Sequence, residues 1–370
     1  MAKCYVCNKD IDSTNITNEH ILLNSIGGRL KSTQLICVEC NSEFGADVDA
    51  ELSKQLNPIS NLLNIERDRG NPQSINVQDK ESGEEWTLDP GGQPVMSKPS
   101  ILEKEEDGEK HIQVVARSIK EARHIMKGLK KKYPQLDIDK ALKKACPKRE
   151  YLDNIFSFQF QIGGDKAFRS ICKTAVNFYI LNGGNPDNIR HLVPYIKNGQ
   201  GGGCVWFYSG PDVVQKDDGQ IIHAIIIKAI EQENVLYSYV EFFNAYRFII
   251  LLNPNYVGED FEKAYIFDVV KRQEVKAITL LNLNKMSVKH MIEGLERPDK
   301  ELSKELNKLI PLIIKKQESD HINGMLERAI GNSLAKYPEG VLITQEMVDE
   351  LIEATMDELT PWFVHKFGKE

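Results

Sequence analysis

The sequence predicts an α+β protein in which a small metal-clamped unit precedes a larger mixed α+β domain and a helical C-terminal region. Two Cys-x-x-Cys pairs lie at 4–7 and 37–40. Short apolar segments separated by turn residues fill the middle of the chain, which is typical of an antiparallel sheet. From about residue 286 the apolar residues recur at helical spacing. We therefore expect three segments, which are 1–70, 71–285 and 286–370.

The composition is that of a globular protein without an overall basic charge. The chain has 370 residues, more than one core comfortably supports, and 41% of them are hydrophobic. Its formal net charge is −7, so any contact with nucleic acid must come from a local basic surface. The sequence has no apolar run of about 18 residues and no secretory leader. We expect a cytoplasmic protein without membrane association.

The two Cys-x-x-Cys pairs, here called knuckles, predict a structural zinc site. Zn²⁺ takes four tetrahedral ligands, and each tight knuckle supplies two thiolates. Paired knuckles in a chain without a secretory leader favour a metal site over disulfides. The other three cysteines are scattered, and we expect them to be small apolar core residues. The four expected zinc ligands are Cys4, Cys7, Cys37 and Cys40.

The segment between the knuckles predicts a ββα unit. It has 29 residues, which is long for a plain zinc ribbon. Asn18-Glu19-His20 precedes an apolar segment, Gly27-Gly28 forms a turn, and Gln34-Leu35-Ile36 leads into the second knuckle. A helical pattern then runs from about residue 41 to 63, and Pro58 is expected to kink it. The predicted unit therefore has a first strand that carries an acid and an imidazole, a returning strand and a helix.

This arrangement resembles the HNH endonucleases of the ββα-metal class. The resemblance covers about residues 1–66 and rests on the acid directly before His20 and on Asn41 directly after the last knuckle cysteine. It implies one divalent cation, Mg²⁺ or Mn²⁺, that polarises a phosphodiester and stabilises the leaving oxygen. It also implies that Glu19 and Asn41 bind this cation. His20 would be the general base, a role that suits an imidazole because its pKa lies near neutrality.

One position departs from the family's pattern. The family usually has an asparagine about five residues before the third cysteine, and this asparagine orients the base. The chain has Ser32 there, with Thr33 and Gln34 beside it. A hydroxyl, an amide or a backbone carbonyl could orient the imidazole, and the sequence leaves the choice open. Asp47 and Asp49 on the following helix are either supporting groups of the site or helix-surface acids.

A basic segment lies further along the chain, at 117–149. It carries twelve Lys or Arg against three acids, a balance of +9. Residues 1–70 carry seven against ten, a balance of −3. Residues 118–133 predict an amphipathic helix whose outer face is basic. That face is either an ordinary solvated surface or a contact surface for a phosphate backbone. The candidate nucleic-acid contacts are Arg29, Lys31, Lys130, Lys131 and Lys132.

These features predict a metal-dependent HNH endonuclease that hydrolyses phosphodiester bonds, with double-stranded DNA as the expected partner. Its cofactors would be a structural Zn²⁺ and a catalytic Mg²⁺ or Mn²⁺. The resemblance suggests a restriction or anti-phage defence role, in which the chain forms a homo-oligomer or binds a defence-system partner. Two alternatives stay open. One is a zinc-stabilised module that binds nucleic acid or protein without catalysis, which Ser32 favours. The other is a ribonuclease, because phosphate chemistry does not reveal the sugar.

Overall fold

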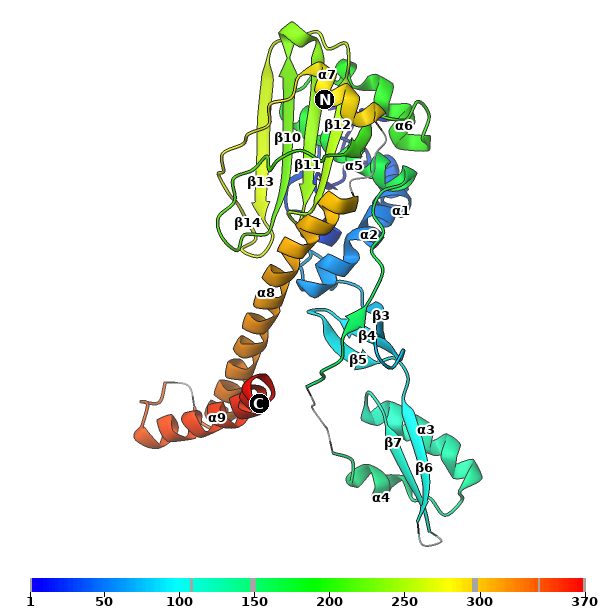
Figure 1. The fold of residues 1–370 in the computed structure, drawn as a ribbon, viewed down its shortest axis with the longest axis vertical. Coiled ribbons are helices and arrows are strands. Elements are labelled where there is room, and N and C mark those ends of the chain that lie inside the picture. Colours follow the sequence, from blue (N-terminus) through cyan, green and yellow to red (C-terminus); the bar gives the residue numbers. More distant parts are fainter. Residues whose placement is uncertain (1, 107–108, 147–150, 295–298, 339, 369–370) are drawn as a thin grey trace. The chain divides into compact units, whose positions relative to one another are not determined.

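The computed structural model describes residues 2–106, 109–146, 151–294, 299–338 and 340–368. The chain divides into two compact units: unit 1 is Met1–Gln73 with Phe160–Lys315, and unit 2 is Ser74–Gln159 with Lys316–Glu370. The expected α+β class is confirmed, since helices and antiparallel sheets are both present (Figure 1). The units differ from the three expected segments because residues 160–315 pack with the first 73 residues.

Unit 1 begins with the hairpin that the knuckles enclose. Strand β1 (Glu19–His20) pairs antiparallel with β2 (Lys31–Ser32). The short helix η1 (Asn24–Ile26) and the two glycines connect them. Gly27 has φ 89°, and a Cβ on Gly28 would lie 2.0 Å from the carbonyl oxygen of Leu22. The turn therefore requires glycine at both positions.

The predicted helix after the second knuckle is two helices, α1 (Val38–Ala46) and α2 (Val48–Leu62). The break falls at Asp47, whose φ and ψ of −116° and −88° are not helical. Gly45, a weak helix former, lies in the last turn of α1. Pro58 lies inside α2 and does not end it. The helix is therefore not interrupted at Pro58.

A six-stranded antiparallel sheet forms the centre of unit 1, in the order β14-β13-β10-β11-β12-β9. This confirms the expected antiparallel sheet. All eight residues of β11 are buried, as expected for a strand covered on both faces. The strands are β9 (Val205–Phe207), β10 (Ile222–Ile230), β11 (Val235–Phe242), β12 (Tyr246–Asn253), β13 (Phe261–Asp268) and β14 (Gln273–Glu274).

Alternate residues of the sheet enter two different cores. Ile225 and Ile227 of β10 belong to the core that also contains the knuckles and α2. Ile226 faces the other way, into a second core with helix α7 (Lys285–Glu293). Helix α5 (Asp165–Leu181) packs against both α2 and the sheet. The N-terminal hairpin is therefore joined to the sheet through α5.

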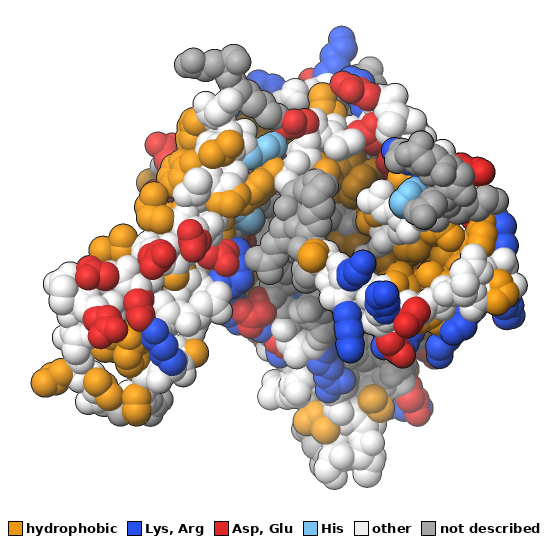
Figure 2. All heavy atoms as spheres, turned by 90° about the horizontal axis from the view of Figure 1, so that it is seen from below, with side chains coloured by type: hydrophobic (Ala, Val, Ile, Leu, Met, Phe, Trp, Pro, Cys, Tyr) orange, Lys and Arg blue, Asp and Glu red, His pale blue; other side chains and the backbone are white. Residues whose placement is uncertain are grey.

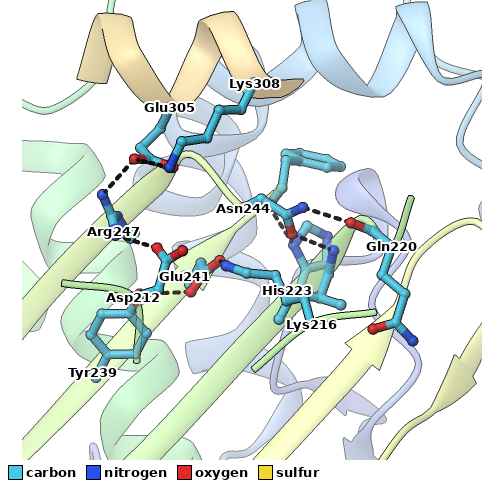
Figure 3. A network of polar contacts seen from close by, with 12 residues as sticks. Asp212, Lys216, Gln220, His223, Tyr239, Glu241, Asn244, Arg247, Glu305 and Lys308 are labelled. Carbon is cyan, nitrogen blue, oxygen red and sulfur yellow. Dashed lines mark hydrogen bonds and ion pairs between the residues drawn. The ribbon is translucent and has the colours of Figure 1, made fainter. Parts of the chain in front are cut away.

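A network of buried ion pairs lies on the sheet of unit 1 (Figure 3). Glu241 is fully buried, and it accepts hydrogen bonds from Lys216 at 2.7 Å and from the Tyr239 hydroxyl at 2.6 Å. Its cross-strand neighbour Arg247 pairs with Glu305 of helix α8 (Asp299–Leu334) at 3.3 Å. Each buried charge has a partner of opposite sign, as burial requires. These pairs tie the first part of α8 to the sheet.

The remaining short elements of unit 1 connect its helices and strands: η2, η3 and α6 (Val193–Asn198) lie between α5 and β9, and η4 lies between β10 and β11. Gly199 ends α6 in a left-handed conformation with φ 75°. The glycine-rich stretch after it leads into a strand, so it does not open a helix that could cradle a phosphate. These elements are η2 (Pro186–Asn188), η3 (Arg190–Leu192), α6 (Val193–Asn198) and η4 (Glu231–Glu233).

Unit 2 contains a four-stranded sheet in the order β5-β4-β3-β8, a separate β6-β7 hairpin and several helices. The acidic stretch from Glu103 begins inside β6, where Glu103 pairs with Ile112. Its elements are β3 (Ile75–Asp79), β4 (Glu85–Asp89), β5 (Gln93–Met96), β6 (Ser100–Glu106), β7 (Glu109–Val115), α3 (Ile119–Lys132), α4 (Ile138–Lys143), β8 (Phe156–Ser157), the end of α8 and α9 (Gln345–Phe367). Among the helices in the described ranges, none combines the length and apolar composition that a membrane crossing needs.

Candidate active site and metal centre

The four knuckle cysteines come together in unit 1. Their sulfur atoms all lie within 4.8 Å of one another, and the Sγ atoms of Cys7 and Cys37 are 3.7 Å apart. A tetrahedral zinc ion with Zn–S bonds of about 2.3 Å places its sulfur ligands about 3.8 Å apart. The donor set and its spacing therefore fit a structural zinc ion, which would clamp the hairpin to the start of α1.

Strand β1 turns its two residues to different environments. Successive side chains of a strand point to opposite faces. Glu19 is only 2% exposed and enters the core, whereas 24% of the His20 side chain is exposed. The two residues expected to act together therefore lie on opposite sides of one strand.

On the outer side, His20 belongs to a cluster centred on Asp68, which follows α2. The Nε2 atom of His20 lies 3.1 Å from Oδ2 of Asp68. Arg29 pairs with the same carboxylate at 2.5 Å, and Lys31 pairs with it as well. The backbone N–H of Asp68 donates to Oδ1 of Asn24 at 3.2 Å, which fixes this loop against η1. We call His20, Arg29, Lys31 and Asp68 the outer cluster.

On the inner side, Glu19 belongs to a cluster built on helix α5. Its carboxylate forms an ion pair with Lys173 and accepts a hydrogen bond from Asn177 at 2.8 Å. Lys173 also pairs with Asp49 of α2 at 2.7 Å, and Ser170 donates to Asp49 at 2.6 Å. One ammonium therefore sits between two buried carboxylates. We call Glu19, Asp49, Ser170, Lys173 and Asn177 the inner cluster.

Residues 4–57 match the HNH endonuclease family. The match spans both knuckles, the β1-β2 hairpin, α1 and most of α2, and we call these residues the HNH unit. It confirms the resemblance drawn from the cysteines, the acid–histidine pair and the following helix. No curated protein and no solved structure matches the chain.

Burial has a larger effect on the pKa of His20 than the charges of the outer cluster. Hydrogen bonding to Lys31, together with that to His20, lowers the pKa of Asp68 to about 2, so it is a carboxylate. Burial lowers the pKa of His20 below its ordinary value and outweighs the opposing effect of Asp68, so the imidazole is neutral at pH 7. A proton on Nε2 would face the Asp68 carboxylate and would leave a lone pair on Nδ1. A neutral imidazole with a free ring nitrogen can accept a proton.

The inner cluster does not fit a divalent cation at Glu19 as the residues are placed. The charges of Asp49 and Glu19 raise the pKa of Lys173 although burial opposes this, so Lys173 carries a positive charge. Burial raises the pKa of Glu19. A cation that approached Glu19 would meet the Lys173 ammonium and a carboxylate that is 98% enclosed, since only 2% is exposed. We therefore assign no chemical step to a metal ion at this residue.

Asn41, the other expected ligand, lies on α1 and has a different partner. Its Nδ2 donates to the Thr17 hydroxyl at 3.0 Å. Within the described ranges, no hydrogen bond or ion pair joins Asn41 to Glu19 or His20. The side chains of the three expected catalytic residues, Glu19, His20 and Asn41, are therefore not joined to one another by such contacts, and their catalytic roles stay predictions.

The expected nucleic-acid contacts fall in both units. Arg29 and Lys31 lie in the outer cluster of unit 1. Lys130, Lys131 and Lys132 end helix α3 of unit 2, where Lys132 pairs with Glu103 at 3.0 Å. Figure 2 shows blue lysine and arginine side chains gathered over the α3 part of unit 2, and red and apolar side chains over α9. Lys148 and Arg149 of the basic segment lie outside the described residues.

Sequence reasoning missed Asp68, Lys173 and Asn177, and it left the role of Asp49 open. A signal for the inner cluster existed: polar Ser170, Lys173 and Asn177 recur at helical spacing between apolar residues, which marks a buried polar stripe. Asp68 gave no such signal. It lies between two arginines in a turn-rich stretch, and its proximity to His20 depends on the path of the chain after α2.

Proposed function

We propose that this chain is an HNH endonuclease that hydrolyses phosphodiester bonds in DNA with His20 as general base. The observation that carries the proposal is the neutral, partly exposed imidazole of His20 on the hairpin of the HNH unit. Nδ1 would take a proton from water, and the resulting hydroxide would attack phosphorus in line with the leaving oxygen. His20 therefore supplies the proton acceptor that the reaction needs.

The proposed requirement for a divalent metal ion rests on the resemblance to the family. The contacts in the structure do not themselves indicate such an ion. Mg²⁺ or Mn²⁺ would supply Lewis-acid polarisation of the phosphate and stabilisation of the leaving oxygen. For Glu19 and Asn41 to hold this ion, Lys173 would have to leave Glu19. The residues of the outer cluster, in contrast, could take part in phosphodiester hydrolysis without a change in their side-chain contacts.

We propose double-stranded DNA as the substrate and basic side chains of both units as its phosphate contacts. Arg29 and Lys31 flank His20 and would meet the scissile phosphate, since guanidinium and ammonium groups bind phosphate oxygens. Lys130, Lys131 and Lys132 would add electrostatic affinity that an acidic HNH unit lacks. The resemblance further suggests restriction or anti-phage defence as the setting, with a second copy of this chain or a defence protein as partner.

A plasmid-cleavage assay tests the proposal. Supercoiled plasmid is incubated with the wild-type protein and Mg²⁺ or Mn²⁺, with and without chelator, beside the His20→Ala variant. We expect nicking that His20→Ala lowers by about 10²–10⁴-fold, the usual contribution of a general base. His124→Ala is the matched control, because His124 is an exposed histidine on α3. Nicking that survives the His20 change would contradict the mechanism, and an RNA substrate in parallel separates the ribonuclease alternative.

The ion pair between Glu19 and Lys173 favours a second candidate function. In this alternative the HNH unit is a zinc-stabilised binding module whose metal-binding acid has become part of the core. The expected result is binding of labelled duplex DNA in a gel-shift assay without cleavage by any tested divalent ion. Cleavage that depends on His20 would exclude this candidate.

A further inference from the structure

The sequence leaves open which residue orients the imidazole of His20, and the outer cluster contains a candidate. The strand register pairs Ser32 with Glu19 and pairs His20 with Lys31, so Ser32 does not lie opposite the imidazole. The Ser32 hydroxyl accepts a hydrogen bond from the backbone N–H of Gln34 at 3.2 Å. Ser32 therefore serves the local turn and does not touch His20.

We propose that Asp68 is the positioning residue of the base histidine, in the place that the family gives to an asparagine on the returning strand. This inference rests on the proposed nuclease function. Asp68 lies outside residues 4–57, the segment that matches the family. Its carboxylate oxygen accepts the Nε2–H of His20 at 3.1 Å and so holds the ring with Nδ1 directed away from the carboxylate.

Asn24 is the other group near the same ring nitrogen, and it cannot hold the same tautomer. Its Nδ2 lies 3.3 Å from Nε2 of His20. An amide N–H needs an acceptor, whereas a nitrogen that donates to Asp68 has no lone pair to offer. The contact with Asp68 is shorter and involves a charged oxygen, so it decides the tautomer. Asn24 instead acts on Asp68, whose N–H it accepts at 3.2 Å.

The same carboxylate arranges the two basic residues beside the imidazole. Arg29 and Lys31 both pair with Asp68, and about a quarter to a third of each side chain is exposed, 26% and 36%. Two positive charges are therefore held within reach of a phosphate next to the proton acceptor. Asp68 would position the base and the phosphate-binding groups together.

The test measures the ring of His20 directly. Protein labelled with ¹⁵N-histidine is examined by two-bond ¹H–¹⁵N spectroscopy, which reports which ring nitrogen carries the proton, and the His20→Gln variant assigns the His20 signals. We expect the Nε2–H form in the wild type, a mixture of both tautomers in Asp68→Ala, and partial recovery in Asp68→Asn, which retains an acceptor oxygen. Glu66→Gln is the matched control, because Glu66 pairs with Arg29 at 3.8 Å but does not touch His20.

Cleavage assays of the same variants complete the test. Asp68→Ala should lower the cleavage rate by about 10- to 100-fold, as the loss of an orienting partner does, and Glu66→Gln should not. An unchanged His20 tautomer in Asp68→Ala, or a changed tautomer with undiminished cleavage, would overturn the proposal. Absence of cleavage in the wild type would instead contradict the nuclease function, and the tautomer measurement would still decide whether Asp68 orients the ring.

Discussion

The inner and outer clusters lie on opposite sides of the same two-residue strand, and they use charge in opposite ways. In the inner cluster one cation, Lys173, forms ion pairs with two carboxylates in the core. In the outer cluster one carboxylate, Asp68, holds two cations and an imidazole near the surface. The inner arrangement satisfies buried charges. The outer arrangement leaves positive charge and a proton acceptor accessible to a polyanion.

This difference shows that adjacency in an acid–histidine motif does not imply a shared role. Because side chains alternate along a strand, Glu19 and His20 meet different neighbours. The neighbours of Glu19 come from α5, a helix outside the matched family segment. Helix α5, which lies outside the matched segment, therefore contacts the Glu19 side of the hairpin, whereas His20 on the other side is partly exposed.

The largest effect should follow from removing the clamp that supports both clusters. We expect Cys37→Ser to lose zinc and to unfold the hairpin of the HNH unit, because structural zinc contributes about 10–16 kcal/mol of apparent binding free energy in small zinc modules. Zinc content by mass spectrometry and far-UV circular dichroism check this. Cys146→Ser, at an exposed cysteine, is the control and should keep one zinc ion per chain. Retention of full zinc content by Cys37→Ser would contradict the clamp.

The next largest effect should separate the inner cluster from the outer one. Lys173→Met leaves Glu19 and Asp49 as buried carboxylates without their cation, which should lower the free energy of unfolding by about 3–5 kcal/mol. Chemical denaturation measures the change. Lys166→Met is matched, since Lys166 lies on the same helix but is 55% exposed in its pair with Asp47, and it should cost less than about 1 kcal/mol. Equal losses in both variants would contradict a structural role for Lys173.

A smaller, pH-dependent effect should come from His223 of β10, which ties the hairpin to the sheet. Its Nε2 donates to the carbonyl of Ile26 in η1 at 2.9 Å, and burial lowers its pKa from 6.5 to about 4. Between these values the unfolded chain binds the proton and the folded protein does not. The free energy of unfolding should therefore be full above pH 6.5 and fall as the pH drops towards 4, by on the order of 3 kcal/mol.

His223→Gln isolates this contribution, because glutamine keeps a donor and does not titrate. Denaturation of wild type and variant at pH 7.5 and pH 4.5 gives the difference. The stability advantage of the wild type should shrink at the lower pH. An advantage that stays constant would show that His223 does not titrate as its burial predicts.

The smallest effect should concern the basic end of α3. Replacing Lys130 and Lys131 with Glu should weaken duplex binding and reduce the slope of log K against log salt by about 2, close to 0.9 for each lost phosphate contact. The exposed pair Lys300 and Lys304 on α8 is the control for charge alone. Fluorescence anisotropy at several salt concentrations measures both slopes. Identical salt slopes in the two double variants would show that the basic end of α3 does not contact the DNA.

Local patterns predicted several of the elements, whereas partners distant in sequence could not be predicted. The knuckles, the antiparallel sheet and α3 follow from cysteine spacing and apolar periodicity, which depend on near neighbours. The break at Asp47 and the partners of Glu19 depend on packing: Lys173 lies 154 residues from Glu19 in the chain. A periodicity argument identifies a buried face of α5 but not the carboxylate that will meet it. The roles expected for Glu19 and Asn41 came from the resemblance, which carries no information about residues beyond the matched segment.

Binding of Mn²⁺ to the wild type and to Glu19→Gln tests most directly the claim that β1 separates a chemical side from a structural one. Electron paramagnetic resonance counts the bound ions, with zinc content and circular dichroism reporting that both proteins are folded. We predict equal numbers of bound Mn²⁺ ions, together with a lower free energy of unfolding for Glu19→Gln, because the substitution weakens the buried pair with Lys173. Loss of one bound Mn²⁺ in Glu19→Gln with unchanged stability would contradict the account and make Glu19 a metal ligand.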